Sequence, residues 1–105
     1  MAHPVNELLD VVHQRVRLGL MAVLYESGKA EFTYLREVLE VTDGNLARHL
    51  EVLEDAGFVR TNKRSSGKRP RTWISITSAG RKAYQAEVEV LKTIVDGADK
   101  RSGIR

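Results

Sequence analysis

The sequence contains no cysteine, only two prolines and a single tryptophan among its 105 residues. The absence of cysteine excludes disulfide bonds, thiolate metal sites and cysteine nucleophiles. The longest uncharged apolar run, Leu18 to Tyr25, has eight residues, whereas a helix needs about 20 to cross a bilayer. The N-terminal residues do not combine a basic region with an apolar stretch. We therefore expect no secretory signal, no membrane partner and a cytoplasmic location.

Motifs of the common enzyme classes are also missing. There is no glycine-rich phosphate loop, no His-Glu-x-x-His motif and no nucleophile elbow. Glu87 and Glu89 are two positions apart on an expected helix, so they point to different faces and do not form a catalytic pair. His3 and His13 lack partners at metal-ligand spacing. The sequence therefore predicts a protein that is not an enzyme and that has no metal site and no cofactor.

The positive charge is concentrated in one window. The chain has 17 Lys and Arg residues against 14 Asp and Glu residues, a net charge of +3. The window from Arg60 to Arg71 holds six basic residues and no acids, and the rest of the chain has a net charge of −3. Blocks of like charge commonly mark anion-binding surfaces, although a solvated loop is the alternative. A chain of this length has room for one domain, residues 1–105.

Hydrophobic spacing predicts four helices before residue 57. We expect them at about Glu7–His13, capped by Asn6; Arg15–Glu26, ended by Gly28; Tyr34–Leu39, capped by Thr33; and 43–56, opened by Thr42 or Asp43. A very short strand, Glu31–Phe32, precedes the third helix. Gly57 and Phe58 fit the last two positions of a Schellman motif, with Phe58 contacting Leu53.

The hydrophobic period changes after Phe58. Val59–Arg64 and Arg71–Ile76 alternate like two strands of a hairpin around a Ser65–Pro70 loop. Trp73 alternates with Ile74, so it faces away from the core side of the hairpin. Thr77 caps a last helix, about Ser78–Asp96. The fold class is thus mainly α with a small β-hairpin: a winged helix-turn-helix with a three-helix core and a wing (6–76), followed by a C-terminal dimerisation helix (about 78–98).

The third and fourth helices are joined by about three residues, which is the geometry of a helix-turn-helix. The fourth helix would then enter the major groove of DNA, with Val41 packed inside the turn. Its candidate contacts are Thr42, Asp43, Gly44, Asn45, Arg48 and His49. Asn45 suits an adenine edge and Arg48 a guanine edge. A capping role is favoured for Asp43, and packing beside the turn is the alternative for His49.

Further contacts are expected on both sides of this helix. The wing residues Lys63, Arg64, Lys68, Arg69 and Arg71 would neutralise phosphates. Thr33 and Tyr34, at the start of the third helix, are candidates for contact with the DNA backbone. The last helix carries Tyr84, Val88, Leu91 and Val95 at heptad-like spacing. This seam predicts a dimer contact, and packing on its own domain is the alternative.

The stretch Thr42–Val59 resembles small prokaryotic winged helix-turn-helix regulators of the MarR/ArsR type, as do Lys68–Thr72 and Ile76–Arg81. The resemblance implies a homodimeric transcription factor, by family a repressor, that binds a palindromic operator. It also implies dimerisation through the first and last helices, which adds Leu8 and Leu9 to the interface. Metal-sensing relatives carry Cys or His/Asp clusters on segments that here contain neither Cys nor His, so metal sensing is not expected.

The sequence is compatible with two functions from different classes. One is sequence-specific binding of double-stranded DNA by a homodimer, with an unknown small-molecule effector as a further partner. The other is a winged-helix module that binds protein or RNA without reading DNA sequence. The basic window together with Asn45 and Arg48 favours the first, because a protein-binding wing would replace these cations with apolar or acidic residues.

Overall fold

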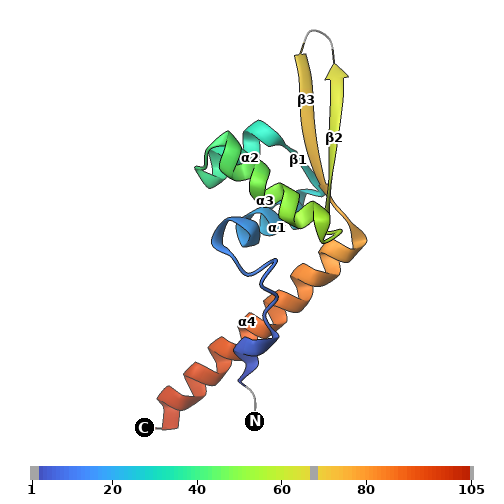
Figure 1. The fold of residues 1–105 in the computed structure, drawn as a ribbon. Coiled ribbons are helices and arrows are strands. Elements are labelled where there is room, and N and C mark those ends of the chain that lie inside the picture. The colour runs from blue at the N-terminus through green and yellow to red at the C-terminus, as the bar shows by residue number, and fades with distance from the viewer. Residues whose placement is uncertain (1–2, 67–68, 105) are drawn as a thin grey trace.

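A computed structural model describes residues 3–66 and 69–104 and gives an elongated molecule with principal extents of 63 × 24 × 22 Å. The elements follow the order of a winged helix (Figure 1). They are a 3-10 helix (Pro4–Glu7), α1 (Arg15–Ser27), β1 (Lys29–Glu31), α2 (Phe32–Leu39), α3 (Asp43–Asp55), β2 (Val59–Ser66), β3 (Arg69–Ile76) and α4 (Ser78–Ile104). The predicted fold class, mainly helical with a small sheet, is confirmed.

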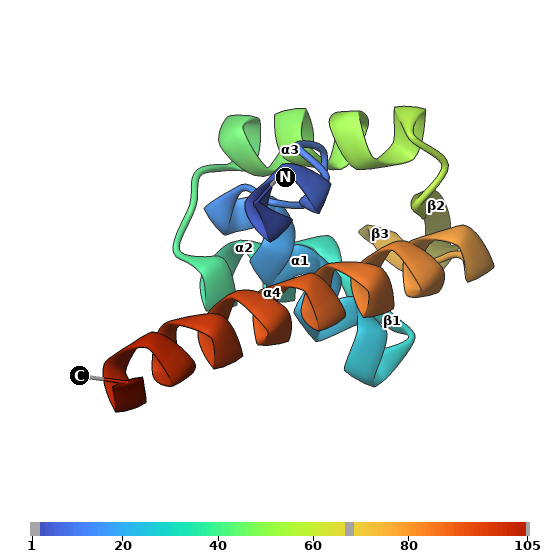
Figure 2. The ribbon, with the colours of Figure 1, turned by 90° about the horizontal axis from the view of Figure 1, so that it is seen from below.

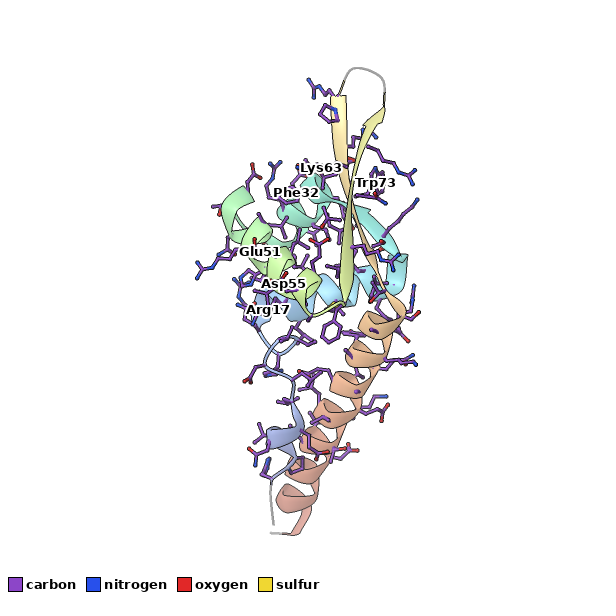
Figure 3. All side chains as sticks on the ribbon, turned by 45° about the vertical axis from the view of Figure 1, so that its right-hand side comes forward. Arg17, Phe32, Glu51, Asp55, Lys63 and Trp73 are labelled. Atoms are coloured by element: carbon purple, nitrogen blue, oxygen red, sulfur yellow. The ribbon has the colours of Figure 1, made fainter. Side chains whose placement is uncertain are left out.

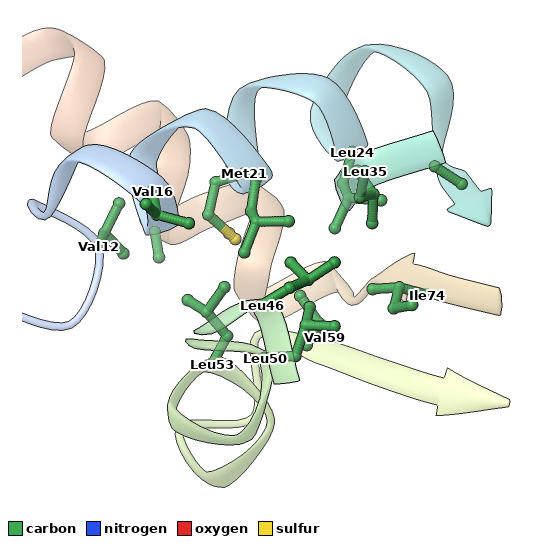
Figure 4. Close-up of a cluster of buried hydrophobic side chains, with 13 residues drawn as sticks. Val12, Val16, Met21, Leu24, Leu35, Leu46, Leu50, Leu53, Val59 and Ile74 are labelled. Carbon is green, nitrogen blue, oxygen red and sulfur yellow. The ribbon is translucent and has the colours of Figure 1, made fainter. Parts of the chain in front are cut away.

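The core lies where α1, α2, α3 and the base of the sheet meet (Figure 4). Its fully buried side chains come from all of these elements: Val16, Leu20, Met21 and Leu24 of α1, Leu35 of α2, Leu46 and Leu53 of α3, and Val59 and Ile74 of the sheet. Burial of each large side chain stabilises the fold by roughly 1.5–3 kcal/mol. Leu46, Leu50 and Leu53 occupy the spacing expected of a helix with one buried face. Val41, in the turn before α3, packs against the same core.

The end of α3 is fixed by a Schellman motif, as the sequence predicts. Gly57 has a φ of 82°. The Phe58 N–H donates to the Leu53 carbonyl and the Gly57 N–H to the Glu54 carbonyl, both at 2.9 Å. These two bonds satisfy carbonyls that the helix end would otherwise leave unpaired. They also turn the chain directly into β2, so the motif sets the angle between α3 and the hairpin.

The sheet is larger than the predicted hairpin. Its strand order is β1-β3-β2, and β2 pairs with β3 from Val59↔Ile76 to Ser66↔Arg69. Both hairpin strands therefore extend into the segment predicted as the Ser65–Pro70 loop. A short strand is present, but the predicted bounds, Glu31–Phe32, are wrong. The strand β1 is Lys29–Glu31, and Phe32 already begins α2. Pairing of Ala30 with the buried Ile74 draws this strand toward the core.

The cap predicted for α2 is wrong. Glu31 occupies the N-cap position and makes no side-chain capping bond. Thr33 lies inside the helix, and its hydroxyl donates to the Glu31 carboxylate at 3.3 Å. Because Glu31 belongs to β1, strand pairing rather than capping decides where α2 begins.

The helix predicted at Glu7–His13 is also wrong, because side chains from elsewhere take up the backbone groups of this segment. The Arg17 guanidinium donates to the carbonyls of Asp10 and Val11, and Glu87 accepts from the Leu9 N–H at 3.2 Å. Asn6 is exposed in the 3-10 helix, and Gln14 instead caps α1, accepting from the N–H groups of residues 16 and 17. Tertiary contacts override the local helical pattern.

The last helix, α4, is longer than predicted and runs away from the wing. The Thr77 hydroxyl caps it, accepting from the Gly80 N–H at 3.0 Å. A Cβ at Gly80 would overlap the carbonyl oxygen of Phe58, so glycine lets α4 start tightly against the α3–β2 turn. Figure 2 shows α1 and the N-terminal segment lying between α3 and α4. Across residues 3–66 and 69–104, no helix combines the length and apolar character that a bilayer crossing requires.

Candidate nucleic-acid interface

The N-terminus of α3 is capped and charge-paired within the protein. The Thr42 hydroxyl is the cap and accepts from the Asn45 N–H at 3.1 Å. Asp43 is the first residue of the helix, not its cap. Its carboxylate accepts from Arg36 of α2 at 2.8 Å, and this hydrogen bond raises the pKa of Arg36. The ion pair offsets the negative charge that would otherwise stand nearest to an approaching phosphate.

The first two turns of α3 expose the residues best suited to reading DNA. Gly44, Asn45 and Arg48 are all exposed, on the side opposite the buried leucines. A Cβ at Gly44 would meet nothing within 4 Å. Within the described residues, no hydrogen bond or ion pair engages the Asn45 or Arg48 side chain. The amide and the guanidinium are therefore available to base edges, beside the positive end of the helix dipole.

His49 faces the protein rather than the exposed side of α3. It is half-buried, and its Nδ1 lies 3.1 Å from Nη1 of Arg17 on α1. Burial, followed by the charges of Arg17, Arg48 and Arg15, lowers the pKa of His49. The lowered pKa favours the neutral imidazole, whose Nδ1 can accept from Arg17. This geometry matches the packing alternative for His49.

The second half of α3 is acidic. Glu51 and Asp55 are exposed, and Figure 3 shows them on the ribbon of α3. Glu54 holds the base of the wing, where its carboxylate accepts from the Thr61 N–H at 3.2 Å. Exposed carboxylates repel phosphate. The helix therefore presents a polar and cationic N-terminal half and an anionic C-terminal half.

The cations of the wing are divided between the two faces of the sheet. Lys63 lines a groove of about 380 Å³ on the α3 side, together with Phe32, Ala47 and Glu51. Arg64 and Arg71 are cross-strand partners that line a different groove, with Trp73. In Figure 3, Lys63 lies on the side of Phe32 and α3, and Trp73 on the other side. Of the residues predicted as wing contacts, Lys63 lies on the face of the sheet that is next to α3.

Two predicted wing cations remain, Lys68 and Arg69. Arg69 is exposed and opens β3. Lys68 lies outside the described residues.

Thr33 and Tyr34 are exposed on α2, but their surroundings differ from those of the α3 N-terminus. Tyr34 is 53% exposed and lines a hollow with Val23, Glu31 and Trp73 on the β1 side of the molecule. The Thr33 hydroxyl is engaged by Glu31. Contact of these two residues with a DNA backbone stays a prediction.

The residues predicted for a dimer interface lie along α4 and the N-terminal segment. The Tyr84 ring packs 5.0 Å from that of Tyr25 on α1, so it also serves its own chain. Leu8, Val88 and Leu91 are half-buried, whereas Leu9 is 43% and Val95 58% exposed. This surface of residues 8, 9, 88, 91 and 95 is named the apolar arm below.

Three cations were missed by the sequence analysis. Arg17 ties the N-terminal segment to His49, Arg36 neutralises Asp43, and Lys29 reaches the outer side of the sheet. A basic residue seven positions before an acid gives no local signal for a bond between two helices. Lys29 becomes informative only once β1 is known to pair with β3. In the described part of the chain, no group of three or more His, Asp or Glu residues is placed to hold a metal ion.

Comparison with known proteins agrees with this geometry. Residues 16–95 match the model of the winged helix DNA-binding domain family. An uncharacterised protein of Methanocaldococcus jannaschii is 43% identical over 77 residues, 73% of this chain and 84% of that protein. The structure of a transcriptional regulator homologue from Pyrococcus horikoshii OT3 is 36% identical, with a TM-score of 0.86 over 93% of this chain and 99% of that one.

A more distant structure shares the fold. A protein of Enterococcus faecalis V583, described as a transcriptional regulator of the MarR family, is 23% identical, with a TM-score of 0.79 over 93% of this chain and 88% of that one. The family match covers most of the chain, including α3 and the wing. The chain therefore belongs to the family of winged helix DNA-binding domains, and it shares its fold with regulators of the MarR family.

Proposed function

We propose that the chain is a sequence-specific transcriptional regulator that binds a palindromic operator as a homodimer, with repression as its outcome. The observation that carries this proposal is the exposed first half of α3, where Asn45 and Arg48 stand without partners in the described part of the chain. Side chains left free at the start of a recognition helix suit base edges in the major groove. The chain also matches a family of DNA-binding domains.

The charges of α3 define how it enters the groove. Because Glu51 and Asp55 are exposed in its second half, a helix lying flat would bring carboxylates against phosphates. Entry by the N-terminal end avoids this and aims Gly44, Asn45 and Arg48 at the bases. It also directs the free N–H groups of the first turn toward the backbone.

The wing supplies affinity that does not depend on sequence. Lys63, on the α3 side of the sheet, would contact the strand nearest the recognition helix. Arg69, which is exposed at the start of β3, would reach the adjacent minor groove. Each phosphate contact releases counterions, so binding should weaken steeply with salt.

The apolar arm supports the homodimer. Leu9 and Val95 expose large apolar side chains on neighbouring elements, and the same arm includes Leu91 and Val88. A second copy would cover this surface through a two-fold contact of like with like. Two recognition helices would then read half-sites about one helical turn apart, roughly 34–36 Å.

An effector site is a further part of the proposal. A hollow of about 640 Å³ lies between α1 and α4, lined by Tyr25, Tyr84 and Val88 together with Gln85 and Glu89. Its volume falls in the range of small-molecule sites. A ligand here would contact α4 beside the apolar arm, so it would bias the spacing of the two recognition helices.

Selection of bound duplexes from a random pool tests the function. A regulator of this kind should enrich a palindrome, and the purified protein should favour that palindrome over random duplex by at least ~10³ at fixed salt. Equal affinity for both duplexes would contradict sequence-specific regulation and favour a protein- or RNA-binding module. Sedimentation of the protein alone should give a dimer.

Variants of α3 distinguish recognition of bases from non-specific electrostatic attraction to DNA. Asn45→Ala and Arg48→Ala should each remove about 1–3 kcal/mol of discrimination at one base position of the half-site. Lys82→Ala, an exposed cation on α4, is the matched control and should leave base preference unchanged. A uniform loss of affinity for all duplexes in the Asn45 variant would argue against its reading role.

A further inference from the structure

The outer face of the three-stranded sheet carries a groove that the proposed function does not use in full. The groove has a volume of about 270 Å³ and lies on the side of the sheet away from α3. Its lining residues come from all three strands: Lys29 of β1, Asn62 and Arg64 of β2, and Arg71, Trp73 and Ser75 of β3. We call this set the outer groove.

Strand register brings these side chains together. Asn62 is the cross-strand partner of Trp73, and Arg64 is the partner of Arg71. On the other edge, Lys29 pairs with Ser75, and its Nζ lies over one face of the Trp73 ring, 5.4 Å from the ring centre, which leaves the opposite face for stacking. Residues directly opposite on one face of antiparallel strands have Cβ atoms about 4.5–5.5 Å apart. An indole therefore lies among three cations that are far apart in the sequence.

The charge around the groove favours an anion. Lys29, Arg64 and Arg71 converge on it, and the Glu31 carboxylate is 3.9 Å from Arg71, an ion pair at the limit of contact. Glu31 and Glu26 line the neighbouring hollow, on the β1 side of Trp73, together with Tyr34. Glu31 therefore offsets part of the charge of Arg71, and the two acids disfavour phosphate in the neighbouring hollow rather than in the outer groove.

Cations around a half-exposed aromatic ring suit a phosphorylated base. Base stacking on an aromatic side chain contributes about 1–3 kcal/mol per base, and cations beside it hold the backbone. A paired duplex cannot use the ring in this way, since its bases are already stacked on one another. Asn62, opposite Trp73, adds an amide that donates to or accepts from a base edge.

We propose that the outer groove binds an unpaired nucleic-acid strand, with one base stacked on Trp73 and the flanking phosphates held by Lys29, Arg64 and Arg71. The groove runs along β2 and β3 from Ser75 to Arg71 and Arg64, so a strand can continue past the stacked base along the wing. A free nucleotide has the same chemistry but contacts only part of this surface. The site is distinct from the face of α3 that the proposed function assigns to duplex DNA.

Trp73 makes the site directly observable because it is the single tryptophan of the chain. Titration with a short thymidine oligonucleotide at low salt should quench Trp73 fluorescence to saturation. The same sequence as a duplex, free thymidine monophosphate and inorganic phosphate are the other arms, and each should quench at least tenfold less effectively at equal phosphate concentration. Equal quenching by duplex or by inorganic phosphate would reduce the groove to a general anion surface and overturn the proposal. If thymidine monophosphate binds as tightly as the oligonucleotide, the groove is a site for a small ligand rather than for a strand, and the proposal is overturned.

Neighbouring residues on opposite faces of β2 provide matched variants. Arg64→Ala should weaken oligonucleotide binding about fivefold or more, whereas Lys63→Ala, one position away on the α3 side, should change it less than twofold. Trp73→Leu should lower the affinity for a labelled oligonucleotide about tenfold and Trp73→Phe much less, because phenylalanine keeps a stacking ring. Circular dichroism checks that each variant is folded. Equal effects of Arg64→Ala and Lys63→Ala would contradict the assignment.

The outcome is independent of duplex recognition. Asn45→Ala should weaken base preference at one position of the duplex half-site and leave the quenching of Trp73 by the oligonucleotide intact. Loss of both activities in this variant would show that they share one surface, which the geometry of the outer groove does not allow.

Discussion

Polar residues near the start of α3 have different roles according to whether their side chains are paired within the protein. Asp43 and His49 both stand near the start of α3, but one is paired with Arg36 and the other with Arg17. Asn45 and Arg48 are exposed on the same helix. The candidate base readers are thus the side chains left over after the protein has satisfied its own charges and hydrogen bonds.

Packing of His49 against α1 makes stability depend on pH. Burial and neighbouring arginines lower its pKa in the folded state, whereas the unfolded chain takes up this proton near pH 6.5. The unfolded state therefore binds more protons, and the free energy of unfolding falls as the pH drops through about 6.5 toward the folded-state pKa. His49→Gln, neutral at every pH, should show a shallower fall between pH 7 and pH 5 in urea unfolding.

The control for this measurement is His3→Gln, which removes an exposed imidazole from the N-terminal segment. It should retain the pH dependence of the original protein. If His49→Gln and the original protein lose stability in parallel, the packing of His49 is not the source.

At the scale of elements, α3 joins two electrostatic halves. Its N-terminal half carries Asn45 and Arg48, and its C-terminal half carries the exposed Glu51 and Asp55. Acids that face a phosphate backbone lower affinity for every duplex equally, so they lower non-specific binding without harming base discrimination. In the proposed regulator, Glu51 and Asp55 would therefore lower affinity for all duplexes, while Asn45 and Arg48 would discriminate between them.

The depth to which α3 enters the major groove determines how strongly each carboxylate repels the DNA phosphates. Glu51→Gln should raise affinity for random duplex about two- to threefold at low salt. Asp55→Asn should raise it less, because Asp55 lies one turn farther from the helix N-terminus. Fluorescence anisotropy at several salt concentrations measures both. A larger effect at Asp55 would show that α3 lies with its C-terminal end toward the DNA.

Elements whose signals are local were predictable from the sequence, and those set by tertiary contacts were not. The leucine spacing of α3 and the Gly57–Phe58 ending identify that helix and its turn into the wing. The alternation of Trp73 with Ile74 also gives its face correctly. The N-terminal segment was misread because Arg17 and Glu87, distant in sequence, bind its backbone. The split of the wing cations follows from alternation at Lys63 and Arg64, but the place of Lys29 required the pairing of β1.

At the scale of the whole molecule, Glu87 links the two parts of the apolar arm, the N-terminal segment and α4. Glu87 is 1% exposed on α4. Its carboxylate accepts from the Leu9 N–H, and its other oxygen lies 2.9 Å from Nδ1 of His13. Figure 1 shows the 3-10 helix beside the C-terminal half of α4, on the far side of the molecule from the β2–β3 hairpin. The Glu87 carboxylate therefore links the N-terminal segment to α4.

Loss of this link should loosen the arm and weaken the proposed dimer. Glu87→Ala leaves the Leu9 N–H without its partner and should lower the free energy of unfolding by about 2–3 kcal/mol. Glu87→Gln keeps an acceptor oxygen and should lose less. Hydrogen exchange at residues 8–13 should rise in the alanine variant, and the dimer dissociation constant in sedimentation should rise with it.

Glu89→Ala is the matched control, because Glu89 lies two residues farther along α4, is exposed and pairs only with Lys92 at 3.7 Å among the described residues. It should change neither exchange nor dimerisation. Unchanged exchange at Leu9 in the Glu87→Ala variant would contradict the linking role. Faster exchange with an unchanged dimer would remove Leu8 and Leu9 from the interface and leave dimerisation to α4 alone.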